Sequence, residues 1–76
     1  MNNERRKTLS DLISKIEELS SQIQSVLDAE QGVYDNMPEN FQQGERGEQS
    51  QSAIDAMQSA VDNLDDVRNS LEEASQ

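Results

Sequence analysis

Residues 9–34 read LSDLISKIEELSSQIQSVLDAEQGVY and show a regular hydrophobic spacing. The apolar residues recur at alternating steps of three and four. With Leu9 as heptad position a, they fill positions a and d for almost four heptads, Glu30 excepted, and part of position e. This periodicity is typical of an amphipathic helix and not of a disordered chain. It predicts a first helix over about residues 8–35, which either begins near Thr8 or is extended backwards by residues 2–7, NNERRK.

The same pattern returns in the second half of the chain and predicts a second helix over residues 50–75. Positions a and d are again apolar, except for Arg68. Position g holds mostly alanine, and such small residues let another helix approach closely. Thr8 and Ser52 are each followed three residues later by an aspartate, as in a capping box, so we expect the helices to begin near them.

The stretch between the two patterns, residues 36–49, is rich in turn-forming residues and contains the only proline of the chain. Pro38 disfavours helical backbone at Met37, so the first helix is expected to end near Asn36. Two helices of similar length joined by such a connector predict an all-α fold, an antiparallel two-helix hairpin in a single domain of residues 1–76.

Each apolar stripe is three positions wide, whereas the seam of a two-stranded coiled coil needs only positions a and d. A lone hairpin would therefore leave an apolar flank in water. We expect a homo-oligomer, most simply a dimer that forms a four-helix bundle. Antiparallel pairing is expected to set Leu19 opposite Leu64. The predicted oligomer core consists of Leu9, Leu12, Ile13, Ile16, Leu19, Ile23, Val26, Leu27, Ile54, Met57, Val61, Leu64, Val67 and Leu71.

Two charged residues, Glu30 and Arg68, occupy core positions of the heptads. They lie about 14 residues apart along the hairpin axis, or roughly 21 Å, too far to meet within one chain. Either each extends to solvent at the edge of its stripe, or Glu30 pairs with Arg68 of the partner subunit. Three further apolar residues near the connector, Tyr34, Met37 and Phe41, either cap the end of the bundle or contact a partner.

Composition narrows the possible functions. Sixteen acidic against six basic residues give a net charge of −10, and the chain has neither cysteine nor histidine. Disulfides and thiolate chemistry are thereby excluded, and the commonest general base and transition-metal ligand is absent. The adjacent carboxylates, such as Glu17 and Glu18, diverge by about 100° around a helix and suit a solvated face. We therefore expect no enzyme activity, no catalytic residue, no cofactor and no metal.

The acidic surface should repel nucleic acid and anionic lipid and attract basic proteins. No apolar run approaches the roughly 18 residues of a membrane span, and none resembles a signal peptide, so the expected location is the cytoplasm. The expected partners are a second copy of the chain and a basic host protein, with no direct contact to nucleic acid or membrane.

The connector resembles a pattern found in small helical-hairpin proteins of tailed phages and prophages, E-x-x-x-x-(D/E)-N-(I/M)-P-E-N-(L/F)-Q followed by an E/S-R pair. The matching residues are Glu30, Asp35, Asn36, Met37, Pro38, Glu39, Asn40, Phe41, Gln42, Glu45 and Arg46. This resemblance implies an oligomeric hairpin without catalytic residues, in the cytoplasm of a bacterial host cell. It also implies two alternative functions. One is a homo-oligomeric interaction or assembly module, and the other is an inhibitor that binds a host defence or nucleic-acid-binding protein, with carboxylates that imitate phosphates.

Overall fold

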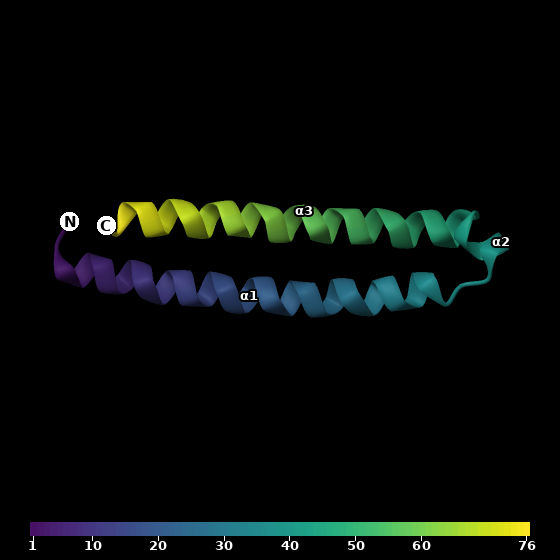
Figure 1. Cartoon of the computed structure of the whole chain (residues 1–76), viewed down its shortest axis with the longest axis horizontal. Coiled ribbons are helices and arrows are strands. Elements are labelled where there is room, and N and C mark those ends of the chain that lie inside the picture. Colours follow the sequence, from purple (N-terminus) through teal and green to yellow (C-terminus); the bar gives the residue numbers. More distant parts are fainter.

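The computed structural model describes residues 1–76, of which 88% are helical and none is in a strand, so the all-helical prediction is confirmed. The chain forms α1 (Asn3–Asp35), the short α2 (Glu39–Gln42) and α3 (Glu45–Ala74). In Figure 1, α1 and α3 lie side by side and run in opposite directions, and α2 lies at the end away from both termini. The Cα atoms span 58 × 15 × 12 Å, which makes the molecule a flat rod.

The first helix begins at Asn3, which agrees with the alternative of a backward extension through residues 2–7, and the cap expected at Thr8 is wrong. The side chain of Asn2, in extended backbone, accepts a hydrogen bond from the backbone N–H of Arg5 at 2.8 Å. Asparagine caps as well as serine or threonine, and no breaker follows it. Thr8 instead donates to the carbonyl of Glu4, inside the helix.

The third helix begins at Glu45, so the predicted start at residue 50 and the predicted cap at Ser52 are also wrong. Gly44 takes the extended N-cap conformation without a side-chain cap. Glu45 and Glu48 lie in the first turn, where carboxylates stabilise the positive end of the helix dipole. The connector therefore shrinks to residues 36–44.

Glutamine–aspartate pairs spaced four residues apart support the outer surfaces of both long helices. Each glutamine Nε2 donates to the aspartate Oδ1 at 2.9 to 3.2 Å. Such pairs stabilise a helix by about 0.2–0.5 kcal/mol each, which helps these polar sequences to remain helical. The four pairs are Gln24–Asp28, Gln31–Asp35, Gln51–Asp55 and Gln58–Asp62.

The connector folds back onto the end of α1. The carbonyl of Tyr34 accepts hydrogen bonds from the backbone N–H of Met37 at 3.1 Å and from Nε2 of Gln42 at 2.9 Å. α1 ends at Asp35, as predicted, and Pro38 then occupies the N-cap position of α2. The Gln42 side chain thus adds a second hydrogen bond to a carbonyl at the end of α1.

We predict that Gln42→Ala lowers the free energy of unfolding by about 1 kcal/mol, because the Tyr34 carbonyl loses a partly buried hydrogen bond. Gln43→Ala is the matched control, since the Gln43 side chain makes only an exposed bond of 3.5 Å to Glu39. Urea unfolding at one fixed protein concentration measures both. Equal losses in the two variants would contradict the role given to Gln42.

Few side chains are buried between the two long helices. The buried and half-buried residues come from different heptad positions in α1 and in α3. Leu27 and Ile54, each 6% exposed, are the buried hydrophobic residues. α1 turns positions a and e toward α3, whereas α3 turns positions a and d toward α1. The expected pairing of Leu19 with Leu64 stays a prediction: Ile16 and Ser20 share a hollow with Leu64, and Leu19 is 46% exposed.

Ser50 is the one buried polar side chain, 4% exposed, and its hydroxyl has no hydrogen-bond partner. We predict that Ser50→Ala raises the free energy of unfolding by about 1 kcal/mol, because it removes an unsatisfied hydroxyl and favours the helix. Ser52→Ala, at an exposed position, is the control. It should raise the free energy of unfolding by only about 0.3–0.5 kcal/mol, which is the contribution of helix propensity. A loss of stability in Ser50→Ala, measured by urea unfolding, would show that the hydroxyl is satisfied in solution.

Candidate protein–protein interface

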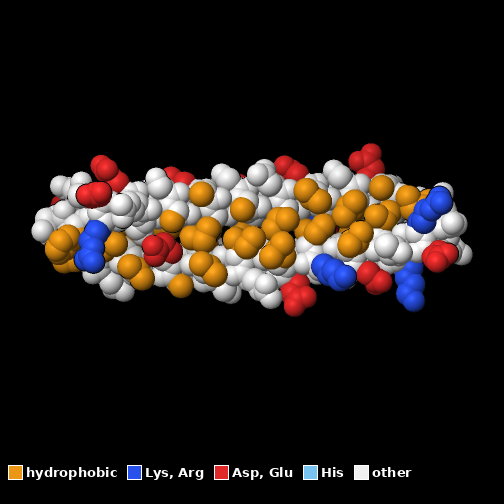
Figure 2. All heavy atoms as spheres, turned by 180° about the vertical axis from the view of Figure 1, so that it is seen from behind, with side chains coloured by type: hydrophobic (Ala, Val, Ile, Leu, Met, Phe, Trp, Pro, Cys, Tyr) orange, Lys and Arg blue, Asp and Glu red, His pale blue; other side chains and the backbone are white.

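One long side of the molecule carries a continuous apolar surface, which we call the apolar face. It consists of the d column of α1 and the g column of α3, namely Leu12, Leu19, Val26 and Val33 with Ala53, Ala60, Val67 and Ala74. The four d residues are 41%, 46%, 59% and 54% exposed in that order. Figure 2 shows hydrophobic side chains in a band along this side of the molecule, with an acidic side chain within the band near the connector end.

A shared hollow shows that the two columns lie on the same side. It is lined by Val26, Ala29, Glu30 and Val33 from α1 and by Ala53 and Met57 from α3. Position d lies about 60° from position a, on the side away from e. Because α1 uses a and e against α3, its d column is left facing solvent.

The two heptad columns of the apolar face contain no acidic residue, although the chain has 16, and Glu30 lies in the hollow between the columns. Positions d and g of α1 and positions g and c of α3 contain neither aspartate nor glutamate. They hold instead three of the six basic residues, Arg5, Lys15 and Arg46. Fifteen of the 16 acidic residues are exposed, and the exception is the half-buried Glu30, which lines the hollow between the two columns. Acidic charge other than that of Glu30 thus lies on the other surfaces.

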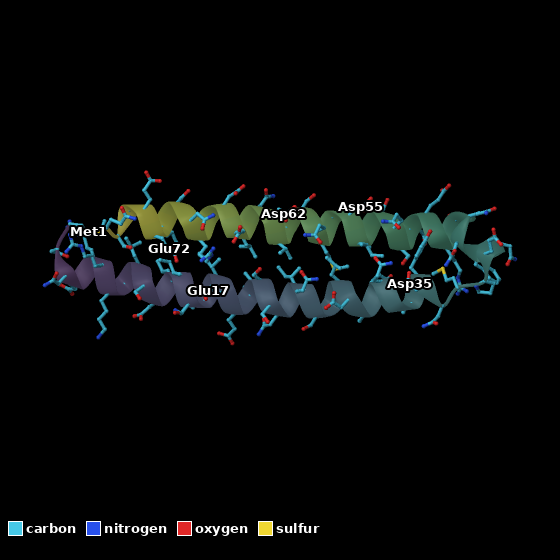
Figure 3. The ribbon with its side chains drawn as sticks, viewed as in Figure 1. Met1, Glu17, Asp35, Asp55, Asp62 and Glu72 are labelled. Carbon is cyan, nitrogen blue, oxygen red and sulfur yellow. The ribbon has the colours of Figure 1, made fainter.

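The opposite side of the molecule is polar. Its hollow is lined by Ile16, Glu17, Ser20, Leu64, Asp65 and Arg68. Arg68 forms ion pairs of 3.1 Å with Asp65 and 3.3 Å with Glu72, both on α3. The hydrogen bond to Asp65 and the charge of Glu72 raise the pKa of Arg68, with a smaller contribution from Glu17 across the seam. Figure 3 labels Glu17 and Glu72 on the ribbon, seen from the side opposite to Figure 2.

Glu30 and Arg68 therefore lie on opposite sides of the molecule. Glu30 lines the hollow of the apolar face and makes no ion pair within the chain, whereas the guanidinium of Arg68 is paired with Asp65 and Glu72 of its own helix. The pairing of Glu30 with Arg68 between subunits stays a prediction.

The connector residues differ in exposure. Phe41 is 45% exposed, whereas Tyr34 and Met37 are half-buried. A bundle cap and a partner contact both stay open for these three residues, with Phe41 the one accessible to a partner.

Other kinds of site are not found in the structure. No group of three or more acidic side chains could hold a metal ion, and no helix is long and apolar enough to cross a bilayer. No family model, curated protein or solved structure matches this chain. The apolar face is therefore the candidate site that this geometry supports best.

Heptad spacing identified the apolar columns of the site, but it did not reveal which column would stay outside the hairpin. It also missed Lys15, which lies at position g on the rim of the apolar face. The distribution of acidic residues could have identified the exposed column, because positions d and g of α1 contain no aspartate or glutamate.

Proposed function

We propose that this chain is a non-enzymatic interaction module that associates with itself through the apolar face. The observation that carries the proposal is the row Leu12, Leu19, Val26 and Val33, spaced seven residues apart and 41–59% exposed. Monomeric proteins rarely expose so continuous an apolar surface. A four-helix bundle made from two hairpins would cover it.

Native mass tests this proposal. Multi-angle light scattering during size-exclusion chromatography, at micromolar concentration, should give about twice the chain mass of 8.5 kDa. A mass of 8.5 kDa across the micromolar range would overturn the proposal. The elution volume alone is a poor measure, because a rod of 58 Å elutes earlier than a sphere of equal mass.

We propose a second candidate function, inhibition of a basic host protein by the acidic surfaces. It is supported by the exposed carboxylates outside the apolar face, of which only Asp65 and Glu72 are paired with a base. The resemblance to small phage and prophage proteins agrees with such a partner in a bacterial cell. Affinity capture from a bacterial lysate at 0.05 and 0.5 M salt tests it, because ionic binding to a basic protein should be lost at high salt.

The two candidates can be separated in the same experiment. A variant altered on the apolar face should lose its self-association and keep any partner that is held by carboxylates. Loss of both would mean that the partner recognises the oligomer.

A further inference from the structure

We infer that Glu30 makes the self-association of this chain sensitive to pH. Its carboxylate weakens the contact between two copies at neutral pH, and each copy takes up a proton at Glu30 when the apolar face is covered. The inference rests on the proposed self-association and adds the residue that regulates it. The surroundings of Glu30, its place along the apolar face and the positions of the bases each support it.

Glu30 lies in apolar surroundings between the two columns of the apolar face. It occupies position a of α1, is half-buried and makes no ion pair within the chain. The hollow that contains it is otherwise lined by side chains without a charge or a hydrogen-bond donor, namely Val26, Ala29, Val33, Ala53 and Met57. Within this hollow the carboxylate therefore depends on water for its solvation.

The titratable groups nearest to Glu30 do not offset its charge. On α1, the half-buried Tyr34 lies one turn further along, and a phenol is uncharged at neutral pH. Asp28 of α1 and Asp55 of α3 lie on outer columns, where each accepts a hydrogen bond from a glutamine. Neither long helix thus presents a base to Glu30.

A second copy would cover Glu30 in either of the two ways in which the apolar faces can meet. With the connectors at opposite ends, α1 packs against α1 of the partner subunit. With both connectors at one end, α1 packs against α3 of the partner subunit. Glu30 is between seven and eight residues from the midpoint of the d column, roughly 11 Å along the helix, and so lies well inside a face 58 Å long. Either way, water is excluded from the hollow.

Neither arrangement brings a lysine to Glu30. With the connectors at opposite ends, Lys15 of the partner subunit is level with Glu30, but position g and position a lie on opposite flanks of the d column. With both connectors at one end, the two Glu30 side chains lie at the same height beside the two-fold axis. Lys15 of the partner subunit is then 15 residues away, or roughly 22 Å along the axis.

The other bases are also out of reach. Arg46 is seven residues from Ala53, which lines the hollow, and so lies roughly 10 Å nearer the connector. Arg68 lies on the opposite side of the molecule, in ion pairs within α3. The bases of residues 5–7 are at the far end of α1, and opposed connectors would place those of the partner subunit roughly 12 Å or more beyond Glu30.

Covering the hollow therefore favours the protonated form of Glu30. Burial without a base disfavours the charged form of a carboxyl group. A dimer either keeps two buried carboxylates at a cost in free energy or takes up a proton at each of them. Because formation of the dimer is linked to proton uptake, self-association should strengthen as the pH falls and weaken as it rises.

Glu30→Gln tests this role, because glutamine keeps the shape of the side chain and removes its charge. At pH 7 and 0.15 M salt, sedimentation equilibrium should give a dissociation constant at least about tenfold below that of the wild type, since two buried carboxylates are removed from each dimer. Glu17→Gln is the matched control, because it removes an exposed carboxylate from the opposite side of α1. Its dissociation constant should stay within about threefold of the wild type.

The pH dependence is the second measurement. Between pH 7 and pH 5.5, the dissociation constant of the wild type should fall at least about fivefold, because dimerisation takes up protons at two Glu30 side chains. That of Glu30→Gln should change less than about twofold, since exposed carboxyl groups titrate near pH 4. Circular dichroism checks that every chain stays helical at both pH values.

The outcomes are distinct. A tighter Glu30→Gln dimer without the pH response supports the role of Glu30. Equal dissociation constants for Glu30→Gln and the wild type, or an equal gain in Glu17→Gln, overturn this role and leave the proposed self-association intact. A weaker Glu30→Gln dimer would mean that a base of the partner subunit binds Glu30, which also overturns it. A mass of 8.5 kDa for both wild type and Glu30→Gln at both pH values overturns the proposed function together with this inference.

Discussion

Leu19→Glu is expected to raise the dissociation constant of the proposed dimer by at least about 100-fold. Leu19 is 46% exposed in one chain, so the substitution costs the single hairpin little. In the proposed dimer it would place two carboxylates in the apolar interface, and burying charge there is unfavourable. Sedimentation equilibrium between 1 and 200 μM measures the change in mass.

Ser21→Glu is the matched control for this experiment. It adds the same charge two residues away, on the exposed outer side of α1. We expect its dissociation constant to stay within about threefold of the wild type. If Leu19→Glu remained dimeric, the apolar face would not be the interface.

The second large effect is expected at Gly47. This residue is buried in the first turns of α3, and a Cβ atom placed on it would overlap the backbone of Gln42 at the end of α2. Gly47→Ala should therefore lower the free energy of unfolding by about 2–3 kcal/mol, because backbone cannot move aside as a flexible side chain can. Thermal and urea unfolding both report this loss.

Gly32→Ala is the opposite case and serves as the control. Gly32 is also helical, but a Cβ atom there would meet no neighbour within 4 Å. Alanine should then stabilise α1 by about 0.5–1 kcal/mol through helix propensity alone. Stabilisation in both variants would contradict the close packing of α2 on α3.

The heptad spacing was sufficient to predict an all-helical fold, because a periodic apolar stripe can be buried by a helix whatever its exact ends. The spacing did not predict the residues at which the helices begin. Asn2, Thr8, Gly44 and Ser52 are all competent N-caps, and local sequence cannot rank them when each is followed by helix-compatible residues. The contact of Gly47 with α2 selected the earlier start of α3, and that contact exists only in three dimensions.

The candidate site was predictable in composition but not in orientation. A stripe of three adjacent columns can turn any two toward a partner helix, and the sequence does not state which. In α1, positions a and e face α3. Leu27 at position e is buried, whereas its neighbour in the chain, Val26 at position d, is 59% exposed. A prediction based on positions a and d alone therefore did not anticipate that Leu19 would be 46% exposed.

The acidic residues lie outside the two heptad columns of the apolar face, so salt should affect self-association and binding to a basic protein in different ways. Two copies bring together a charge of −10 each, and at 0.01 M salt, where the Debye length is about 30 Å, this repulsion acts across the whole width of the bundle. At 0.15 M salt the Debye length falls to about 8 Å, so the repulsion between the two copies is screened and self-association should become stronger. A basic protein bound by the outer carboxylates should instead dissociate, because the same salt screens its attraction. A salt titration of the native mass, alone and with such a protein present, should therefore show the two equilibria moving in opposite directions.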